Sequence, residues 1–97
     1  MVTQPKSSVP QVQTMCTKHG RWFSRELTGR YKEESEEALL ERIERLNRKL
    51  GMLGVVPVDK GSSPHIRAEY LECILDFEVH PPCGCKAPDL PEGFHDA

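Results

Sequence analysis

The sequence has no long hydrophobic run. No stretch approaches the ~20 apolar residues that a membrane-spanning helix needs. Residues 1–20 also lack the apolar core of a secretory signal peptide. We therefore expect a cytoplasmic chain without a membrane partner, in a compartment where thiols stay reduced.

Recognisable catalytic motifs are missing as well. The chain has no glycine-rich phosphate-binding loop and no serine nucleophile motif. A cysteine nucleophile beside a histidine needs an orienting third group and a pocket, which a chain of 97 residues rarely builds. We therefore expect that the chain is not an enzyme.

The length of the chain indicates one small domain. Residues 1–14 are mostly Gln, Ser, Thr, Pro and Val, and we predict a disordered N-terminal tail there. Residues 87–97 are rich in Pro, Asp and Gly and are predicted to form an extended Pro-rich C-terminal tail. Residues 15–86 remain as a single small helical domain, of a size at which a metal or a partner often stabilises the fold. The oligomeric state stays open.

The clearest predicted element is a helix over residues 36–50. Ser35 is a suitable N-cap, and Gly51 is suited to positive φ just after the helix. Apolar residues at spacings of four and three form one narrow stripe, made of Leu39, Ile43, Leu46, Leu50 and Leu53. This stripe either packs on the rest of the domain or forms a dimerisation or docking face.

A second helix is predicted over residues 64–78. Ser63 is a capping residue type, and Pro64 suits the first helical position. The apolar stripe of this helix comprises Ile66, Tyr70, Cys73, Ile74 and Phe77, and Glu69 belongs to the polar face. Residues 71–79 also alternate with a period of two, so a strand competes with the helix there. The expected fold class is mainly α, with two helices, irregular ends and the option of a short β-hairpin near a zinc knuckle.

Four cysteines in a reducing compartment indicate metal binding, packing or reactivity rather than disulfides. The segment Cys16-x-x-His19-Gly20 resembles a zinc knuckle over these five residues. Two ligands on a tight turn can bind one metal together, and a following glycine tolerates the positive φ that such a turn needs.

The other two ligands of such a site have to come from far along the chain. Cys83-Gly84-Cys85 is the preferred second pair, and His80 is a reserve ligand. The predicted cofactor is thus a structural zinc ion held by Cys16, His19, Cys83 and Cys85. It would clip the two ends of the ordered region together. Unligated thiols are the competing interpretation.

Charge is unevenly distributed along the chain. Residues up to Lys32 hold six basic side chains and one acid, whereas the remainder holds seven basic and fourteen acidic ones. Basic side chains can neutralise phosphates, and exposed aromatic rings can stack on bases. The alternative function is therefore that of a nucleic-acid-binding zinc-knuckle protein that uses segment 18–32, with Lys18, Arg21, Trp22, Arg25, Arg30 and Lys32 as contacts.

By elimination, the predicted function is that of a small non-enzymatic protein-interaction module. It would be an adaptor, or an inhibitor or modulator, of a larger protein or complex, and by analogy small regulators of phages and mobile elements often have this form. The Pro-rich ends could order on binding. Leu90 and Phe94 in the C-terminal tail are the candidate anchors for that partner.

Overall fold

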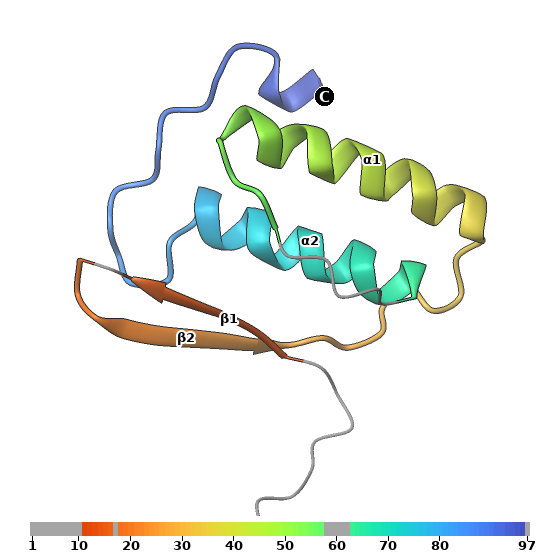
Figure 1. Ribbon diagram of the computed structural model, residues 1–97, viewed down its shortest axis with the longest axis horizontal. Coiled ribbons are helices and arrows are strands. Elements are labelled where there is room, and N and C mark those ends of the chain that lie inside the picture. Colours follow the sequence, from red (N-terminus) through yellow and green to blue (C-terminus); the bar gives the residue numbers. More distant parts are fainter. Residues whose placement is uncertain (1–10, 17, 58–62, 97) are drawn as a thin grey trace, which may run out of the picture.

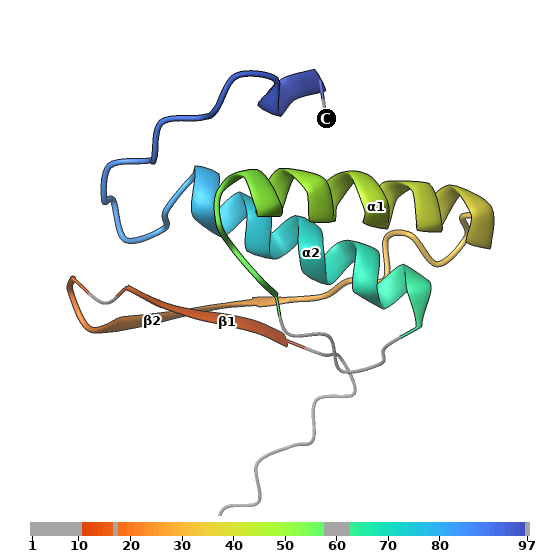
Figure 2. The ribbon, with the colours of Figure 1, turned by 45° about the horizontal axis from the view of Figure 1, so that its top comes forward.

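The computed structural model describes residues 11–16, 18–57 and 63–96. Along the chain the elements are β1 (Gln11–Cys16), β2 (Arg21–Glu26), α1 (Glu36–Met52), α2 (Pro64–Val79) and the short 3-10 helix η1 (Phe94–Asp96). The two strands form an antiparallel hairpin. Helix α2 lies between this hairpin and α1, so the molecule has three layers (Figures 1 and 2).

Both predicted helices are confirmed, and the optional hairpin is present. The helices contain 17 and 16 residues and each strand contains six. "Mainly α" is therefore too strong a class for a structure with two helices and a two-stranded antiparallel sheet. The competing strand over residues 71–79 is not formed, because α2 continues to Val79.

The first strand begins inside the segment predicted to be a tail. Strand β1 starts at Gln11, so residues 11–14 are part of the hairpin rather than of a disordered end. Val12 is 1% exposed and packs in the same cluster as Cys73 and Phe77 of α2. Burial of this side chain and pairing with β2 order the segment. Residues 1–10 of the predicted tail lie outside the described residues.

The end of α1 also differs from the sequence prediction. The helix runs past Gly51 to Met52, and it is Gly54 that takes a positive φ of 74°. The Gly54 N–H donates to the Gly51 carbonyl at 3.0 Å, and the Val55 N–H donates to the Leu50 carbonyl at 2.9 Å. These two bonds form a Schellman motif. Val55 packs on the cluster that contains Leu50, and this apolar contact fixes where the helix stops.

Helix α2 is covered on two sides by separate apolar clusters. Ala68 and Leu71 pack with the α1 stripe, of which Leu39, Ile43 and Leu50 are buried. Cys73 and Phe77 pack with Val12 of β1 and with Leu27, which follows β2. The α1 stripe is therefore used within the chain, as the first of its two interpretations predicted.

Glu69 is buried, although the sequence placed it on the polar face of α2. Its side chain is 2% exposed. One carboxylate oxygen accepts hydrogen bonds from the Thr28 N–H at 2.7 Å and the Thr28 hydroxyl at 3.0 Å, and the other accepts from the Gly29 N–H at 2.8 Å. Burial raises the pKa of Glu69, but these hydrogen bonds more than offset it and the net pKa is lowered. Glu69 of α2 thus holds the loop that connects β2 with α1 in place.

The C-terminal segment runs back over α1 (Figure 1). It ends in η1, so it is not extended throughout. Phe94 is 4% exposed, and the Lys49 ammonium of α1 lies 5.5 Å from the centre of its ring. In this conformation Phe94 is therefore not the exposed docking anchor that the sequence predicted. Leu90 is half-buried, and its role as an anchor stays a prediction.

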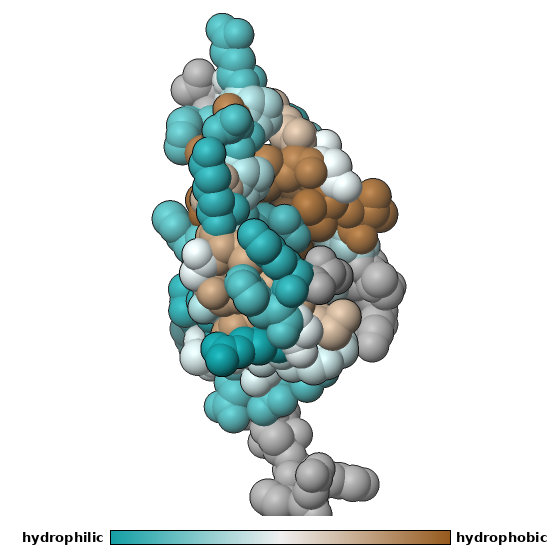
Figure 3. Space-filling model, turned by 90° about the vertical axis from the view of Figure 1, so that its left-hand side faces the viewer, coloured by the Kyte–Doolittle hydropathy of each residue, from teal (hydrophilic) through white to brown (hydrophobic). Residues whose placement is uncertain are grey.

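The surface at the hairpin-turn end is mostly hydrophilic, with one hydrophobic area to the side (Figure 3). Within the described residues, neither helix combines the length and hydrophobicity required to cross a bilayer.

Candidate metal centre

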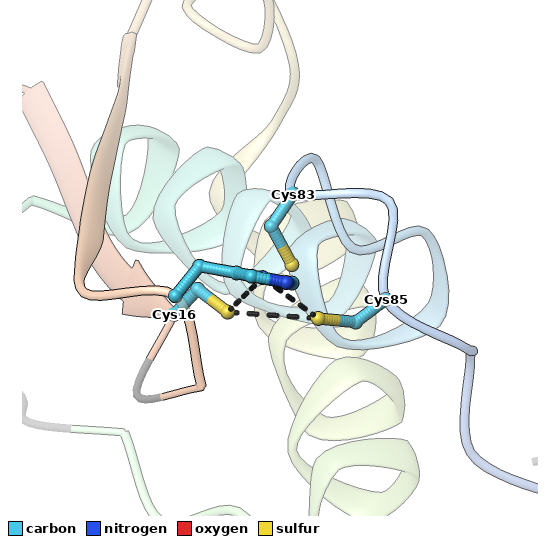
Figure 4. A group of neighbouring side chains, drawn as sticks. Cys16, Cys83 and Cys85 are labelled. Atoms are coloured by element: carbon cyan, nitrogen blue, oxygen red, sulfur yellow. Dashed lines mark hydrogen bonds between the residues drawn. The ribbon is translucent and has the colours of Figure 1, made fainter.

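The structure brings together the four side chains that the sequence selected as metal ligands. One ligand atom from each of Cys16, His19, Cys83 and Cys85 lies within 4.8 Å of all the others. The Cys16 sulfur is 3.4 Å from His19 Nδ1 and 3.6 Å from the Cys85 sulfur, which is itself 3.5 Å from His19 Nδ1. In Figure 4 the sulfurs of Cys16, Cys83 and Cys85 converge on one point from two segments of chain.

These separations fit ligands around a shared ion. In a tetrahedral zinc site, Zn–S distances of about 2.3 Å and Zn–N distances of about 2.0 Å place sulfurs about 3.8 Å apart and sulfur and nitrogen about 3.5 Å apart. The sulfur–sulfur distance of 3.6 Å and the sulfur–nitrogen distances of 3.4 and 3.5 Å agree with this to within about 0.2 Å. A disulfide would need about 2.05 Å, and all four cysteines are free. The separations among Cys16, His19 and Cys85 therefore match a ligand cage and not a covalent pair, and Cys83 brings a third sulfur within 4.8 Å of them.

The first two ligands are held by the turn of the hairpin. Cys16 ends β1 and pairs with Arg21, the first residue of β2. The Gly20 N–H donates to the Cys16 carbonyl at 2.7 Å, and Gly20 has a φ of 65°, which favours glycine. The backbone of His19 also donates to the Cys16 sulfur. This closed turn points both ligands toward the same side.

The other two ligands follow the end of α2. The His80 N–H donates to the Asp76 carbonyl at 2.7 Å and closes the helix. The Gly84 N–H then donates to the Pro81 carbonyl at 3.2 Å, and Gly84 has a φ of 81°. This turn brings Cys83 and Cys85 to one side despite their close spacing. His80 is exposed and is not part of the four-residue group, so the reserve ligand is not used.

The thiols of the cage strongly perturb one another. A hydrogen bond from the His19 backbone, helped by the neighbouring thiols, lowers the pKa of Cys16 to about 6. Hydrogen bonds with Cys83, the larger cause, and with Cys16 raise the pKa of Cys85 to about 12. The protein groups alone thus favour the thiolate form of Cys16 and oppose the thiolate form of Cys85 beside it. A bound cation would remove this conflict, because it favours the deprotonated form of every thiol that it contacts.

The residues predicted to bind nucleic acid divide into two groups. Arg25 and Arg30 are held by acids of α2: Arg25 lies 2.7 Å from Asp76, and Arg30 lies 2.9 Å from Glu72. Both arginines remain exposed in these ion pairs, and so are the other predicted contacts, namely Lys18, Arg21, Trp22 and Lys32. The continuous basic patch of the sequence is therefore interrupted, and it is the placement of α2 against the hairpin that interrupts it.

Sequence reasoning did not identify Met15 as a candidate functional residue. The strand register places it directly opposite Trp22, and both side chains are exposed. Without knowledge of the register, a methionine in a polar segment gives no signal of this pairing.

Searches with the chain found no matching family model, curated protein or solved structure. What the chain does has to be argued from its own residues.

Proposed function

We propose that this chain is a non-enzymatic protein-interaction module whose fold is stapled by one structural zinc ion. The observation that carries the zinc assignment is the convergence of three thiols and one imidazole within 4.8 Å of one another. Thiolate and imidazole ligands in a tetrahedral arrangement favour zinc among the common divalent metals. The site needs reduced thiols, as in the cytoplasm.

The zinc has a structural role in this proposal. Four protein ligands complete a tetrahedral shell and leave no open position for a substrate or a reactive water. The clip joins positions 69 residues apart, from the hairpin turn to the loop after α2. Closing a loop of this length is worth about 4 kcal/mol in the chain-entropy treatment used for disulfides. Small domains have a free energy of unfolding of only about 5–15 kcal/mol, so the metal contributes a large part of it.

Two of the five exposed large apolar side chains of the described residues stand opposite each other on the hairpin, and this pair favours a role in protein interaction. Trp22 is 67% exposed and Met15 is 43% exposed. Trp and Met are enriched at protein interfaces, and Trp is often the residue that dominates binding energy. A larger protein or complex is the partner in this proposal, with the chain acting as an adaptor or modulator.

Nucleic-acid binding is the second candidate, supported by the exposure of Lys18, Arg21 and Trp22 near the metal centre. It is weaker because Arg25 and Arg30, although exposed, already pair with acids of α2, so that a phosphate would have to compete with these acids for them. Binding that falls steeply with salt and is weakened by Arg21→Ala would support it.

Metal analysis tests the zinc assignment. After dialysis the purified chain should retain about one zinc ion per molecule. Cys83→Ser should abolish retention and lower the melting temperature. Cys73→Ser is the matched control, because Cys73 is buried in the core and lies outside the cage, so zinc should stay bound. A chain that keeps no zinc, or a Cys83→Ser variant that keeps all of it, would refute the site.

The interaction role has a separate test. A partner captured with the zinc-loaded chain should, once purified, bind it stoichiometrically in calorimetry. Binding should be weakened by Trp22→Ser and unaffected by Leu40→Ser, which changes an exposed apolar residue on α1. If no protein partner binds the purified chain and an oligonucleotide does, the second candidate replaces the first.

A further inference from the structure

We propose that the surface of α1 around Lys49 docks a partner segment in which acidic residues flank an aromatic anchor. We call this surface the tail site, because the chain's own C-terminal tail, residues 86–96, runs over α1 and occupies it until a partner displaces the tail (Figures 1 and 2). This inference rests on the proposed interaction function and gives it a second surface with a stated partner chemistry.

One buried ring holds the tail on α1. The Phe94 side chain is 4% exposed, and the Lys49 ammonium lies 5.5 Å from the centre of its ring. Among the buried apolar residues that the structure describes, Phe94 alone belongs to neither of the two core clusters that cover α2. The ring is therefore a separate contact, and its release leaves both clusters intact.

Little else ties the tail to the rest of the chain. Residues 86–89 are exposed, and the Phe94 N–H donates at 3.1 Å to the Pro91 carbonyl, which belongs to the tail itself. Within the described part of the chain, no hydrogen bond or ion pair joins residues 86–94 to another element. A site that holds an aromatic ring without backbone hydrogen bonds accepts the same ring from another chain. The tail begins after Cys85, so it can leave α1 without opening the metal cage.

Charge favours an acidic segment at the tail site. Arg45 and Lys49 are one helical turn apart on α1 and therefore lie on the same side of it. Arg45 is exposed and makes no ion pair with another described residue. The tail residues before the anchor carry the opposite sign, because Asp89 and Glu92 are the only charged residues between Lys86 and Phe94, and both are exposed. An acidic segment of another chain obtains the same attraction, which salt screens.

The tail competes with any segment that arrives from another molecule. Full burial of one phenylalanine side chain corresponds to a ratio of docked to free tail of about 100. A short linker holds its end at an effective concentration on the order of 1 mM. A free peptide with the tail's sequence should therefore bind the vacant site with a Kd on the order of 10 µM, and the occupied site about 100-fold more weakly.

Fluorescence anisotropy of a labelled synthetic peptide, residues 86–97, tests the tail site on the full-length chain. Phe94→Ala vacates the site, so this variant should bind the peptide about 100-fold more tightly than the natural chain does. The same peptide carrying Phe94→Ala should not bind. In the Phe94→Ala chain, Lys49→Gln should weaken binding severalfold and reduce its salt dependence. Arg21→Gln is the matched control and should have no effect, because Arg21 is an exposed basic residue of β2, which α2 separates from α1.

Circular dichroism checks that each variant is folded. If Phe94→Ala unfolds, Phe94→Leu takes its place, because it keeps an apolar side chain and loses only the ring; it should also bind the peptide more tightly than the natural chain, by a smaller factor. A random peptide library displayed on phage and selected on the same variant tests the partner chemistry. We expect the selected peptides to contain an aromatic residue flanked by Asp or Glu.

Several outcomes would overturn the tail site: no peptide binding to the folded variant, equal affinity for the variant and the natural chain, or enrichment of basic sequences. Binding weakened by Arg21→Gln as much as by Lys49→Gln would also overturn it. These measurements use no captured protein. Failure of the tail site therefore leaves the Met15–Trp22 pair of the proposed function standing, and failure of the Trp22→Ser test leaves the tail site standing.

Discussion

Replacing Glu69 with Gln should be among the most damaging single changes in the chain. The Glu69 carboxylate is 2% exposed and accepts three hydrogen bonds, two from Thr28 and one from the Gly29 N–H. Glutamine has one acceptor oxygen and one NH₂ group, so its NH₂ must face a donor whichever way the amide is turned. At least one buried polar group is then unsatisfied and the charge assistance is lost, which costs about 3 kcal/mol.

The stability loss of Glu69→Gln is measured by urea unfolding and by thermal melting. In a domain of this size a loss of about 3 kcal/mol lowers the melting temperature by roughly 15 °C. Glu72→Gln is the matched control on the same helix. Glu72 accepts hydrogen bonds from Arg30 at 2.9 Å and from the Tyr31 hydroxyl, but its side chain is 32% exposed, and a hydroxyl can turn to accept from a glutamine NH₂ instead. The control should therefore cost less than about 1 kcal/mol.

The pH dependence gives an independent check on the same residue. The pKa of Glu69 is lowered in the folded state. Its stabilising contribution is therefore full above the ordinary glutamate pKa of about 4.3, and it is lost as the pH falls from there through the lowered folded value. The difference between the natural chain and Glu69→Gln should shrink over that range. Equal losses for Glu69→Gln and Glu72→Gln at neutral pH would refute the role assigned to Glu69.

Three further outcomes are expected. Gly51→Ala should raise the free energy of unfolding by about 0.5–1 kcal/mol, because Gly51 is helical and a Cβ there meets nothing within 4 Å. Gly54→Ala should lower it by about 1 kcal/mol, because Gly54 has a positive φ. Urea unfolding measures both changes, and a destabilising Gly51→Ala with a stabilising Gly54→Ala would mean that the helix stops at Gly51. In the zinc-free chain, under conditions where circular dichroism shows that it stays folded, iodoacetamide should alkylate Cys16 faster than Cys85 at neutral pH, because the pKa of Cys16 is lowered to about 6 and that of Cys85 is raised to about 12. Peptide mass spectrometry distinguishes the two sites, and equal rates in the folded chain would contradict this assignment. Phe94→Ala should cost about 3 kcal/mol in urea unfolding, because Phe94 is buried in its own chain; no loss would mean that Phe94 is free, as the sequence first suggested.

The parts of the fold that local signals control could be predicted from the sequence. Ser35 caps α1 as expected, with its hydroxyl accepting from the Ala38 N–H at 3.2 Å. Pro64 opens α2, but the Ser63 side chain makes no capping bond. The four cage residues could be selected because the ligand chemistry of Cys and His depends on residue type and spacing.

The features that the sequence prediction missed depend on which elements meet in space. Glu69 looks solvated in a helical pattern, and only the cover on both sides of α2 turns it into a buried acceptor. Arg25 looks like a free cation until α2 places Asp76 beside it. Gly54 stops α1 because of a contact between Val55 and the core, which no local propensity encodes.

X-ray absorption at the zinc edge tests most directly whether the four-residue cage holds a structural zinc. For the zinc-loaded chain we predict a first shell of three sulfurs at about 2.3 Å and one nitrogen at about 2.0 Å. These correspond to the thiols of Cys16, Cys83 and Cys85 and to the imidazole of His19. A shell made only of oxygen and nitrogen, or one with fewer than three sulfurs and a bound water, would contradict the closed structural site.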